Sequence, residues 1–369
     1  MNSSLQADEK VLVTGASGFI ALHILDVLLS ERFHVIGTVR SKDKGEKIKK
    51  SFEELYPYAQ LDFEIVPDVA AAHAFDGILK KYPDIKHILH TASPFSFGSG
   101  KSMEETYLIP ATHGTRNILE STKNLGKNVK HVVITSSFAS ILNLDREGDS
   151  SFIHTEKTWN PITWDIAKAN EITSYIASKK LAEELSWKFL EENKSDVNFT
   201  ITTVTPPYVL GPQMFDWGLE RSSLNTSAEI VNQALQSTPA SKGPFDVPNG
   251  VACDVRDVAL LHMLPLRNEN LAGHRLFPIS GTGLKQRDYE DAKFNLQRVL
   301  DVMNTKFPEL RGKISPGDIK DNKPYLDKIY YYNNDETCQL TGVEFKPFDV
   351  TIYDSTKQIL DYEKLQSKS

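Results

Sequence analysis

The chain has 369 residues, of which 40% are hydrophobic and 25% charged, and its formal net charge at pH 7 is −7. This length is enough for one large or two moderate domains with a buried core. The acidic balance gives no support for nucleic-acid binding, which favours a basic face. The two cysteines, Cys253 and Cys338, indicate neither a disulfide framework nor a cysteine-based zinc site, so we expect no metal.

The start of the chain, MNSSLQADEK, is polar and carries acids, which is not typical of a signal peptide. A membrane span would need a run of about 18 apolar residues, and the sequence offers none. We therefore expect a cytoplasmic protein without a membrane partner.

The strongest local pattern is KVLVTGASGFIA, from Lys10 to Ala21. Residues 11–13 form a short apolar run typical of a buried strand, and the periodic run 19–28 predicts a helix packed on a sheet. The turn between them offers backbone N–H groups to an anion, and its glycines let a phosphate approach closely. The spacing Gly15-x-x-Gly18-x-x-Ala21 fits a dinucleotide fingerprint, although an ordinary strand–helix turn can show it too. The expected cofactor contacts here are Gly15, Ser17, Gly18, Phe19 and Ile20.

Apolar runs and helical periodicity then alternate over about 135 residues. Strands are predicted at 33–39, 61–66, 86–91 and 130–135, with a helix within 103–124. This alternation predicts an α/β fold of the Rossmann type, a doubly wound parallel sheet with helices on both faces. Ligands of such sheets bind at the C-terminal ends of the strands.

Residues at these strand ends predict how a cofactor is held. The second strand ends at Arg40, with Lys44 one helical turn on, where an acidic residue would bind the ribose 2′-hydroxyl of NAD. The arginine fork matches a phosphate instead, so we expect NADP, the alternative being a solvated surface arginine. Asp68 and Val69 follow the third strand, where an adenine ring is expected. Thr91 ends the fourth strand, Ala92 and Ser93 follow it, and all three are further cofactor candidates.

A polar segment at 143–163 is interpreted as a loop over the site, followed by a long helix at about 167–193. On that helix Tyr175 and Lys179 are four residues apart and share one face. Reduction of a carbonyl by hydride needs a proton donor at the oxygen, and an ammonium beside a phenol favours the phenolate. Ser137, at the end of the fifth strand, suits holding the substrate oxygen. Any helix can carry such a Tyr–Lys pair, but the glycine turn and strand-end serines favour chemistry.

The motifs VTGASGFIA, HTASPF, TSS, YIASK and PPYVLGP occur in this order and together resemble the extended short-chain dehydrogenase/reductases. The resemblance covers about residues 10–365. It is nearest to the dihydroflavonol-reductase-like group, which includes NADPH-dependent methylglyoxal and carbonyl reductases of yeast. It implies a catalytic set of Ser137, Tyr175 and Lys179.

The resemblance also implies cofactor contacts elsewhere. Arg40 and Lys44 match the family's positions for the 2′-phosphate, and the loop PPYVLGP borders the nicotinamide, which adds Pro206, Tyr208 and Val209. Ser136 and Ser137 point to opposite faces of their strand, so only one can serve. The register of the family favours Ser137.

Two domains are predicted from the sequence. Residues 1–205, ending in a sixth strand at 198–205, form an NADP-binding domain to which segments near 255–285 return. Residues 206–369 form mainly a smaller, discontinuous substrate lobe with a helix at 349–365. Aromatic and apolar side chains near strand ends predict a hydrophobic pocket, although core packing explains them equally well. These candidates are Phe95, Phe97, Phe138, Tyr208, Met214 and Phe215.

The predicted function is reduction of small aldehydes and ketones by NADPH, with Tyr175 as proton donor. A nucleotide-sugar epimerase or dehydratase of the same superfamily is one alternative, and a non-catalytic NADP-binding regulatory protein is another. Arg221, Arg256 and Arg287 are scattered and form no clear cluster for a sugar-nucleotide pyrophosphate. The expected partner is a small carbonyl compound, and the chain is expected to be a monomer or homodimer.

Overall fold

The computed structural model of the protein describes residues 9–93, 100–219, 226–285 and 291–367. The chain divides into two compact units. The first comprises residues 1–142, 159–205 and 259–276, and the second comprises 143–158, 206–258 and 277–369. The chain thus passes between the units five times, where the sequence predicted one main boundary at 205 and one returning region.

The first unit contains a sheet of seven strands in the order β10-β7-β5-β4-β1-β2-β3, and all its neighbours are parallel. Every strand predicted in residues 1–205 is present, with its ends shifted by at most two residues. The order reverses beside β1, which is the switch point of a doubly wound fold. The bounds are β1 Lys10–Thr14, β2 His34–Val39, β3 Leu61–Ile65, β4 Ile85–His90, β5 His131–Thr135, β7 Thr200–Val204 and β10 Arg275–Leu276.

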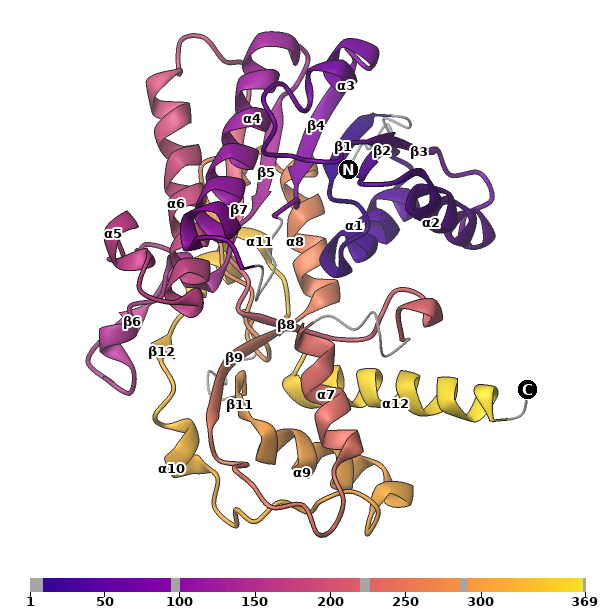
Figure 1. The fold of residues 1–369 in the computed structure, drawn as a ribbon, viewed down its shortest axis with the longest axis vertical. Helices are drawn as coiled ribbons and strands as arrows, with labels where there is room; N and C mark the ends of the chain where they lie inside the picture. The colour runs from indigo at the N-terminus through magenta and orange to yellow at the C-terminus, as the bar shows by residue number, and fades with distance from the viewer. Residues whose placement is uncertain (1–8, 94–99, 220–225, 286–290, 368–369) are drawn as a thin grey trace. The chain divides into compact units, whose positions relative to one another are not determined.

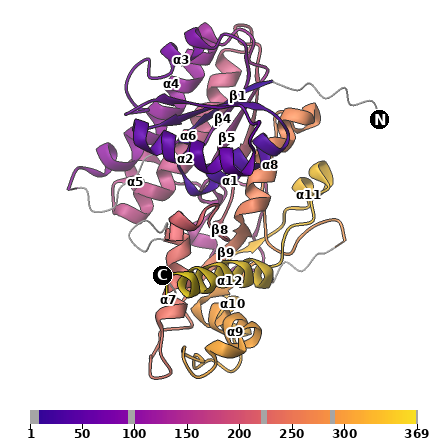
Figure 2. The same ribbon diagram turned by 90° about the vertical axis from the view of Figure 1, so that its right-hand side faces the viewer.

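Helices cover both faces of this sheet (Figures 1 and 2). α1 (Phe19–Ser30) and α2 (Lys42–Leu55) lie on one face. α3 (Asp76–Lys81), α4 (Ile109–Leu125) and α6 (Glu171–Glu192) lie on the other, where their apolar side chains share a buried core with the strands. A π-helical turn, Glu104–Leu108, leads into α4, and the short α5 (Trp164–Ala167) precedes α6. The predicted Rossmann-type α/β class is confirmed.

The second unit has two small sheets. β8 (Tyr208–Leu210) and β11 (Lys293–Asn295) flank β9 (Pro248–Asp254), and β6 (Ile153–His154) pairs with β12 (Tyr331–Tyr332). α8 (Val255–Arg267) follows β9 and belongs to the first unit from Ala259 on. The other helices are α7 (Thr226–Gln236), α9 (Leu296–Lys306), α10 (Lys323–Leu326), α11 (Asp335–Thr341) and α12 (Phe348–Gln366), the last near the predicted bounds 349–365.

The interpretation of 143–163 as a loop was wrong for part of its length. His154 in β6 binds the carbonyl oxygen of Tyr331 through Nδ1 at 2.9 Å and accepts the Asn143 N–H at Nε2 at 3.1 Å. A two-residue strand has too few residues to show an apolar period, so its pairing with a distant segment leaves no trace in the local sequence.

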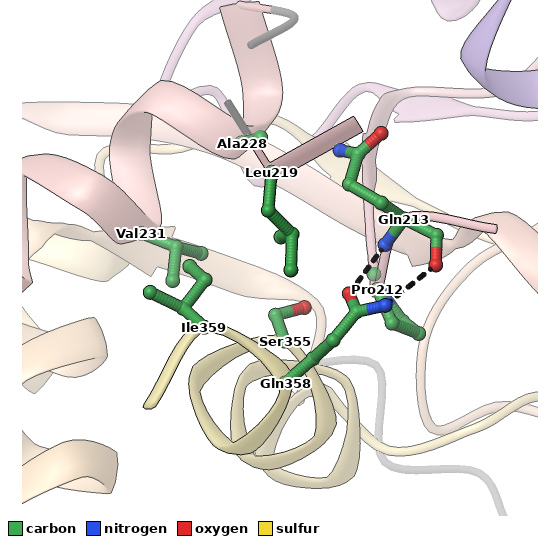
Figure 3. Close-up of a pocket in the computed structure, with 9 residues that line it drawn as sticks. Pro212, Gln213, Leu219, Ala228, Val231, Ser355, Gln358 and Ile359 are labelled. Carbon is green, nitrogen blue, oxygen red and sulfur yellow. Dashed lines mark hydrogen bonds between the residues drawn. The ribbon is translucent and has the colours of Figure 1, made fainter. Parts of the chain in front are cut away.

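Two glutamines tie α12 to the segment after β8. The Gln213 N–H donates to Gln358 Oε1 at 2.8 Å, and Gln358 Nε2 donates to the Gln213 carbonyl at 2.9 Å. Beside them α7 and α12 leave a small, mainly apolar hollow (Figure 3). Neither Met214 nor Phe215 is among the described residues that line it. None of the helices in the described ranges is long and apolar enough to cross a membrane.

Candidate active site

The glycine turn after β1 is built to leave backbone N–H groups for an anion. Gly15 has φ +67°, and a Cβ there would lie 2.9 Å from the Cα of Ala92, so glycine is required. Its N–H donates to Thr38 Oγ1 at 3.1 Å, which fixes the turn against β2. Gly18 is the N-cap of α1, and no side chain caps that helix. The first N–H groups of α1 therefore suit a pyrophosphate. Ser17, Phe19 and Ile20, also predicted as contacts, are part-buried in this turn and the start of α1.

Two exposed basic residues lie at the end of β2. Arg40 follows the strand directly, and within the described part of the chain no hydrogen bond or ion pair engages its guanidinium. Lys44 is exposed in the first turn of α2. This arrangement fits a phosphate on the ribose. Asp68 is exposed and accepts the Ala70 N–H at 2.8 Å, whereas the side chain of Val69 is buried in the core.

The end of β4 is fastened to the end of β1. Thr91 Oγ1 donates to the Thr14 carbonyl at 2.5 Å, and the Ala92 N–H donates to Thr14 Oγ1 at 3.2 Å. Ser93, the next residue, accepts a hydrogen bond from Lys179 Nζ at 2.7 Å. The strand end predicted to border the cofactor is therefore in contact with the predicted catalytic lysine.

Tyr175 and Lys179 lie in the first half of α6. A capping box starts this helix, with Thr173 N–H donating to Asn170 Oδ1 at 3.0 Å and Asn170 N–H donating to Thr173 Oγ1 at 3.2 Å. The ammonium of Lys179 is 5.5 Å from the centroid of the Tyr175 ring. Burial lowers the pKa of Lys179 to about 8. Lys179 also lines a cavity of about 20 Å³ in the first unit, which is room for one water molecule.

The two adjacent serines after β5 have different surroundings. Ser136 is buried and donates to Glu183 Oε2. Ser137 is part-buried, and its Oγ accepts the Ala139 N–H at 3.1 Å at the start of a 3₁₀ turn, Phe138–Ser140, which leaves its O–H to donate elsewhere. Ala139 packs in one apolar cluster with Tyr175. The structure thus brings the turn that carries Ser137 onto the face of α6 that carries Tyr175.

The remaining predicted residues do not join this group. Phe95 and Phe97 lie outside the described residues. Phe138 is buried in the first unit, so it does not form an open pocket wall there. Tyr208 is exposed and Phe215 stacks on Trp217 at 5.5 Å between ring centroids. Pro206, Tyr208, Val209, Met214 and Phe215 all belong to the second unit.

A buried ion pair beside the site was missed in the sequence. Arg275 Nε donates to Glu183 Oε1 at 2.7 Å, and both side chains are almost completely buried. Glu183 could have been noticed because it follows Lys179 by four residues on the same helix face. Arg275 could not have been noticed in the same way, because it lies on β10 and no local sequence pattern distinguishes it.

Comparison with known proteins places the chain in a family. The model of the 3-beta hydroxysteroid dehydrogenase/isomerase family matches residues 12–231. The chain belongs to this family. The resemblance to extended short-chain dehydrogenase/reductases is confirmed.

Relatives of the chain include two named reductases. The NADPH-dependent methylglyoxal reductase GRE2 of Saccharomyces cerevisiae is 39% identical over 96% of this chain and 98% of the relative. Aldehyde reductase 2 of Sporidiobolus salmonicolor is 30% identical over 89% of each chain. The crystal structure of yeast methylglyoxal/isovaleraldehyde reductase Gre2 complexed with NADPH matches with a TM-score of 0.87 at 38% identity, covering 96% of this chain and 99% of that one.

Proposed function

We propose that this protein is an NADPH-dependent reductase of small aldehydes and ketones. The observation that carries the proposal is the position of Lys179, whose part-buried ammonium lies between Ser93 at the end of β4 and the ring of Tyr175. The glycine turn leads into an uncapped helix, and Arg40 has no hydrogen bond or ion pair with any residue that the structure describes. The two lie at neighbouring strand ends of the same sheet and fit a pyrophosphate and a 2′-phosphate. Relatives with NADPH-dependent reductase activity support the same assignment.

Each side chain then has a separate role in the reaction. NADPH, when bound, supplies the hydride that adds to the carbonyl carbon. Tyr175 donates its phenolic proton to the carbonyl oxygen, and the Ser137 O–H holds that oxygen by a hydrogen bond. The ammonium of Lys179 stabilises the phenolate that remains on Tyr175 until the proton is replaced. The carbonyl carbon and oxygen thereby gain a hydride and a proton, which gives the alcohol.

The proposal includes the location and partners of the protein. Both cysteines, Cys253 and Cys338, are buried thiols that form no disulfide, as is usual in a reducing compartment. We accordingly propose a cytoplasmic protein, a monomer or homodimer, whose partner is a small carbonyl compound.

The experiment measures NADPH oxidation by its absorbance with small aldehydes, α-dicarbonyls and aryl ketones, with NADH in parallel. We expect turnover of several carbonyls with a preference for NADPH. Replacing Tyr175→Phe is expected to lower kcat by about 10²–10⁴-fold while leaving the Kd of NADPH within about twofold, because only the proton donor is lost. Tyr362→Phe on α12 is the matched control and keeps full activity.

Two results contradict the proposal. Full activity of Tyr175→Phe removes the tyrosine from the chemistry. Tight NADPH binding without turnover of any carbonyl points to the epimerase or the non-catalytic alternative, and a nucleotide-sugar panel then separates those two.

A further inference from the structure

The 3₁₀ turn Phe138–Ser140, with Ser137 at its start, is held by a buried ion pair. Glu183 on α6 is 1% exposed and Arg275 on β10 is 9% exposed. Burial opposes ionisation of Glu183, but the Arg275 guanidinium and the Ser136 hydroxyl hold its pKa below the usual value. Both side chains are therefore charged in a place where charge is costly unless every polar atom has a partner.

Hydrogen bonds lead from this ion pair to the backbone of Ser137. Ser136 donates to Glu183 Oε2, and Arg275 donates to Ser140 Oγ at 3.0 Å. Ser140 in turn donates its O–H to the carbonyl oxygen of Ser137 at 2.7 Å. The residue before Ser137 and the carbonyl of Ser137 itself are thus both connected to the ion pair.

A second clamp holds the other side of the turn. Asn160 Nδ2 donates to the Ala139 carbonyl at 2.8 Å, and the Asn160 N–H donates to the Ser140 carbonyl at 2.8 Å. The ring of Trp159 lies 4.0 Å from the Arg275 guanidinium. The turn therefore has little freedom to move while the ion pair is intact.

Glu183 also belongs to the face of α6 that carries the proposed proton donor. Tyr175, Lys179 and Glu183 follow one another at intervals of four residues, so they lie on one side of the helix. A single rigid helix thus carries both the proton donor and the anchor of the serine turn.

We propose that Glu183 and Arg275 are positioning residues that hold the Ser137 hydroxyl at its working distance from Tyr175. This inference rests on the proposed function, because it needs Ser137 to hold the substrate oxygen. A displacement of about 1 Å in such a group can lower the rate roughly 100-fold. A purely structural ion pair would affect stability alone.

A second hydrogen bond to the Glu183 carboxylate provides a matched control. Thr203 on β7 donates to Glu183 Oε1 at 2.8 Å but has no bond to the serine turn. Ser140→Ala removes the bond from Arg275 to the turn together with the bond from Ser140 to the Ser137 carbonyl. It leaves the ion pair itself in place, so the protein is expected to fold. Thr203→Val removes a hydroxyl donor to the same carboxylate without touching the turn.

The test compares these two variants in the full-length protein. For Ser140→Ala we expect kcat at least tenfold lower, a Kd of NADPH within twofold, and a larger kinetic isotope effect with deuterated NADPH. For Thr203→Val we expect kcat within twofold and a comparable loss of thermal stability. If the two variants lower kcat equally, or neither lowers it, the positioning role is wrong.

Ser137→Ala separates this inference from the proposed function. Adding Ser140→Ala to Ser137→Ala is expected to cause no further loss of kcat, because the group being positioned is already absent. An equal loss in both backgrounds contradicts the inference. Full activity of Ser137→Ala instead contradicts the proposed role of the serine. Low activity of Ser137→Ala together with normal activity of Ser140→Ala contradicts the positioning role of the ion pair and leaves the proposed function standing.

Discussion

At the scale of single residues, Lys179 combines two demands that oppose each other. Its ammonium must be charged to stabilise a phenolate, yet burial favours the neutral amine and lowers its pKa to about 8. The hydrogen bond from the ammonium to Ser93 Oγ offsets part of this cost. A lysine at this position is therefore poised to change its charge near the pH at which an enzyme works.

This burial predicts a specific dependence of stability on pH. The pKa of Lys179 is about 8 in the folded protein and near 10.5 when it is free, so between these values the unfolded chain binds more protons. The free energy of unfolding of the wild type should therefore rise relative to Lys179→Met as the pH rises from 8 to 10.5, by up to roughly 3 kcal/mol. Urea unfolding of both proteins without cofactor measures this difference. Parallel stability curves would show that the amine is not buried.

Not every residue of the site was visible in the sequence. Alternation along β5 showed that only one of Ser136 and Ser137 can serve, and the structure separates them because the Ser136 hydroxyl is engaged by Glu183. The spacing of Tyr175 and Lys179 was readable because both lie on one helix. The role of Arg275 was not readable from the sequence, because its partner Glu183 is 92 residues away and only the fold brings the two side chains together.

At the scale of elements, the glycine turn is fixed by its backbone. Gly15 has φ +67°, and a Cβ would lie 2.9 Å from the backbone of Ala92. Gly18 lies in an extended conformation with φ −76°, and a Cβ there would have no neighbour nearer than 3.4 Å. The two glycines of one motif therefore differ in whether their positions can accommodate a Cβ atom.

We expect Gly15→Ala to lower the free energy of unfolding by roughly 1–3 kcal/mol through strain and close contact. Gly18→Ala is the matched control and should change it by no more than about 0.5 kcal/mol. Urea unfolding in the absence of cofactor compares them without interference from binding. Equal effects of the two substitutions would contradict the assigned backbone strain.

The burial and length of each strand explain which elements could be predicted from the sequence. The inner strands β1 and β5 are buried on both faces, so each contains a continuous apolar run that stands out between polar turns. The edge strand β3 has the sequence LDFEI, which alternates instead, and most of its residues are part-buried or exposed. The pairing of β6 with β12 depends instead on two residues and on one histidine bound at both ring nitrogens. Short strands held by such distant polar contacts leave no periodic pattern.

At the scale of the whole molecule, the first unit is completed by a late part of the chain. Residues 259–276 return to it and supply β10, which pairs with β7 and carries Arg275. Glu183 precedes its counter-ion Arg275 by 92 residues in the chain, so its burial as an ion pair needs the segment that carries β10. The buried ion pair therefore links formation of the sheet edge to burial of α6.

This link predicts a reversal in the effect of one substitution. Glu183→Gln in the wild type leaves Arg275 buried without a counter-ion and should cost about 3–5 kcal/mol of unfolding free energy. Arg275→Met should cost a similar amount because Glu183 is then the unpaired charge. Adding Glu183→Gln to Arg275→Met removes that charge, so the same substitution should now raise stability.

Chemical unfolding of the four proteins measures both effects in one cycle. Lys188→Met, which removes one partner of the exposed pair Lys188–Glu192 on the same helix, is the control and should change stability by less than about 1 kcal/mol. If Glu183→Gln destabilises both backgrounds equally, the carboxylate and the guanidinium act independently. A gain in the Arg275→Met background instead shows that the late segment 259–276 neutralises a charge that the rest of the first unit cannot.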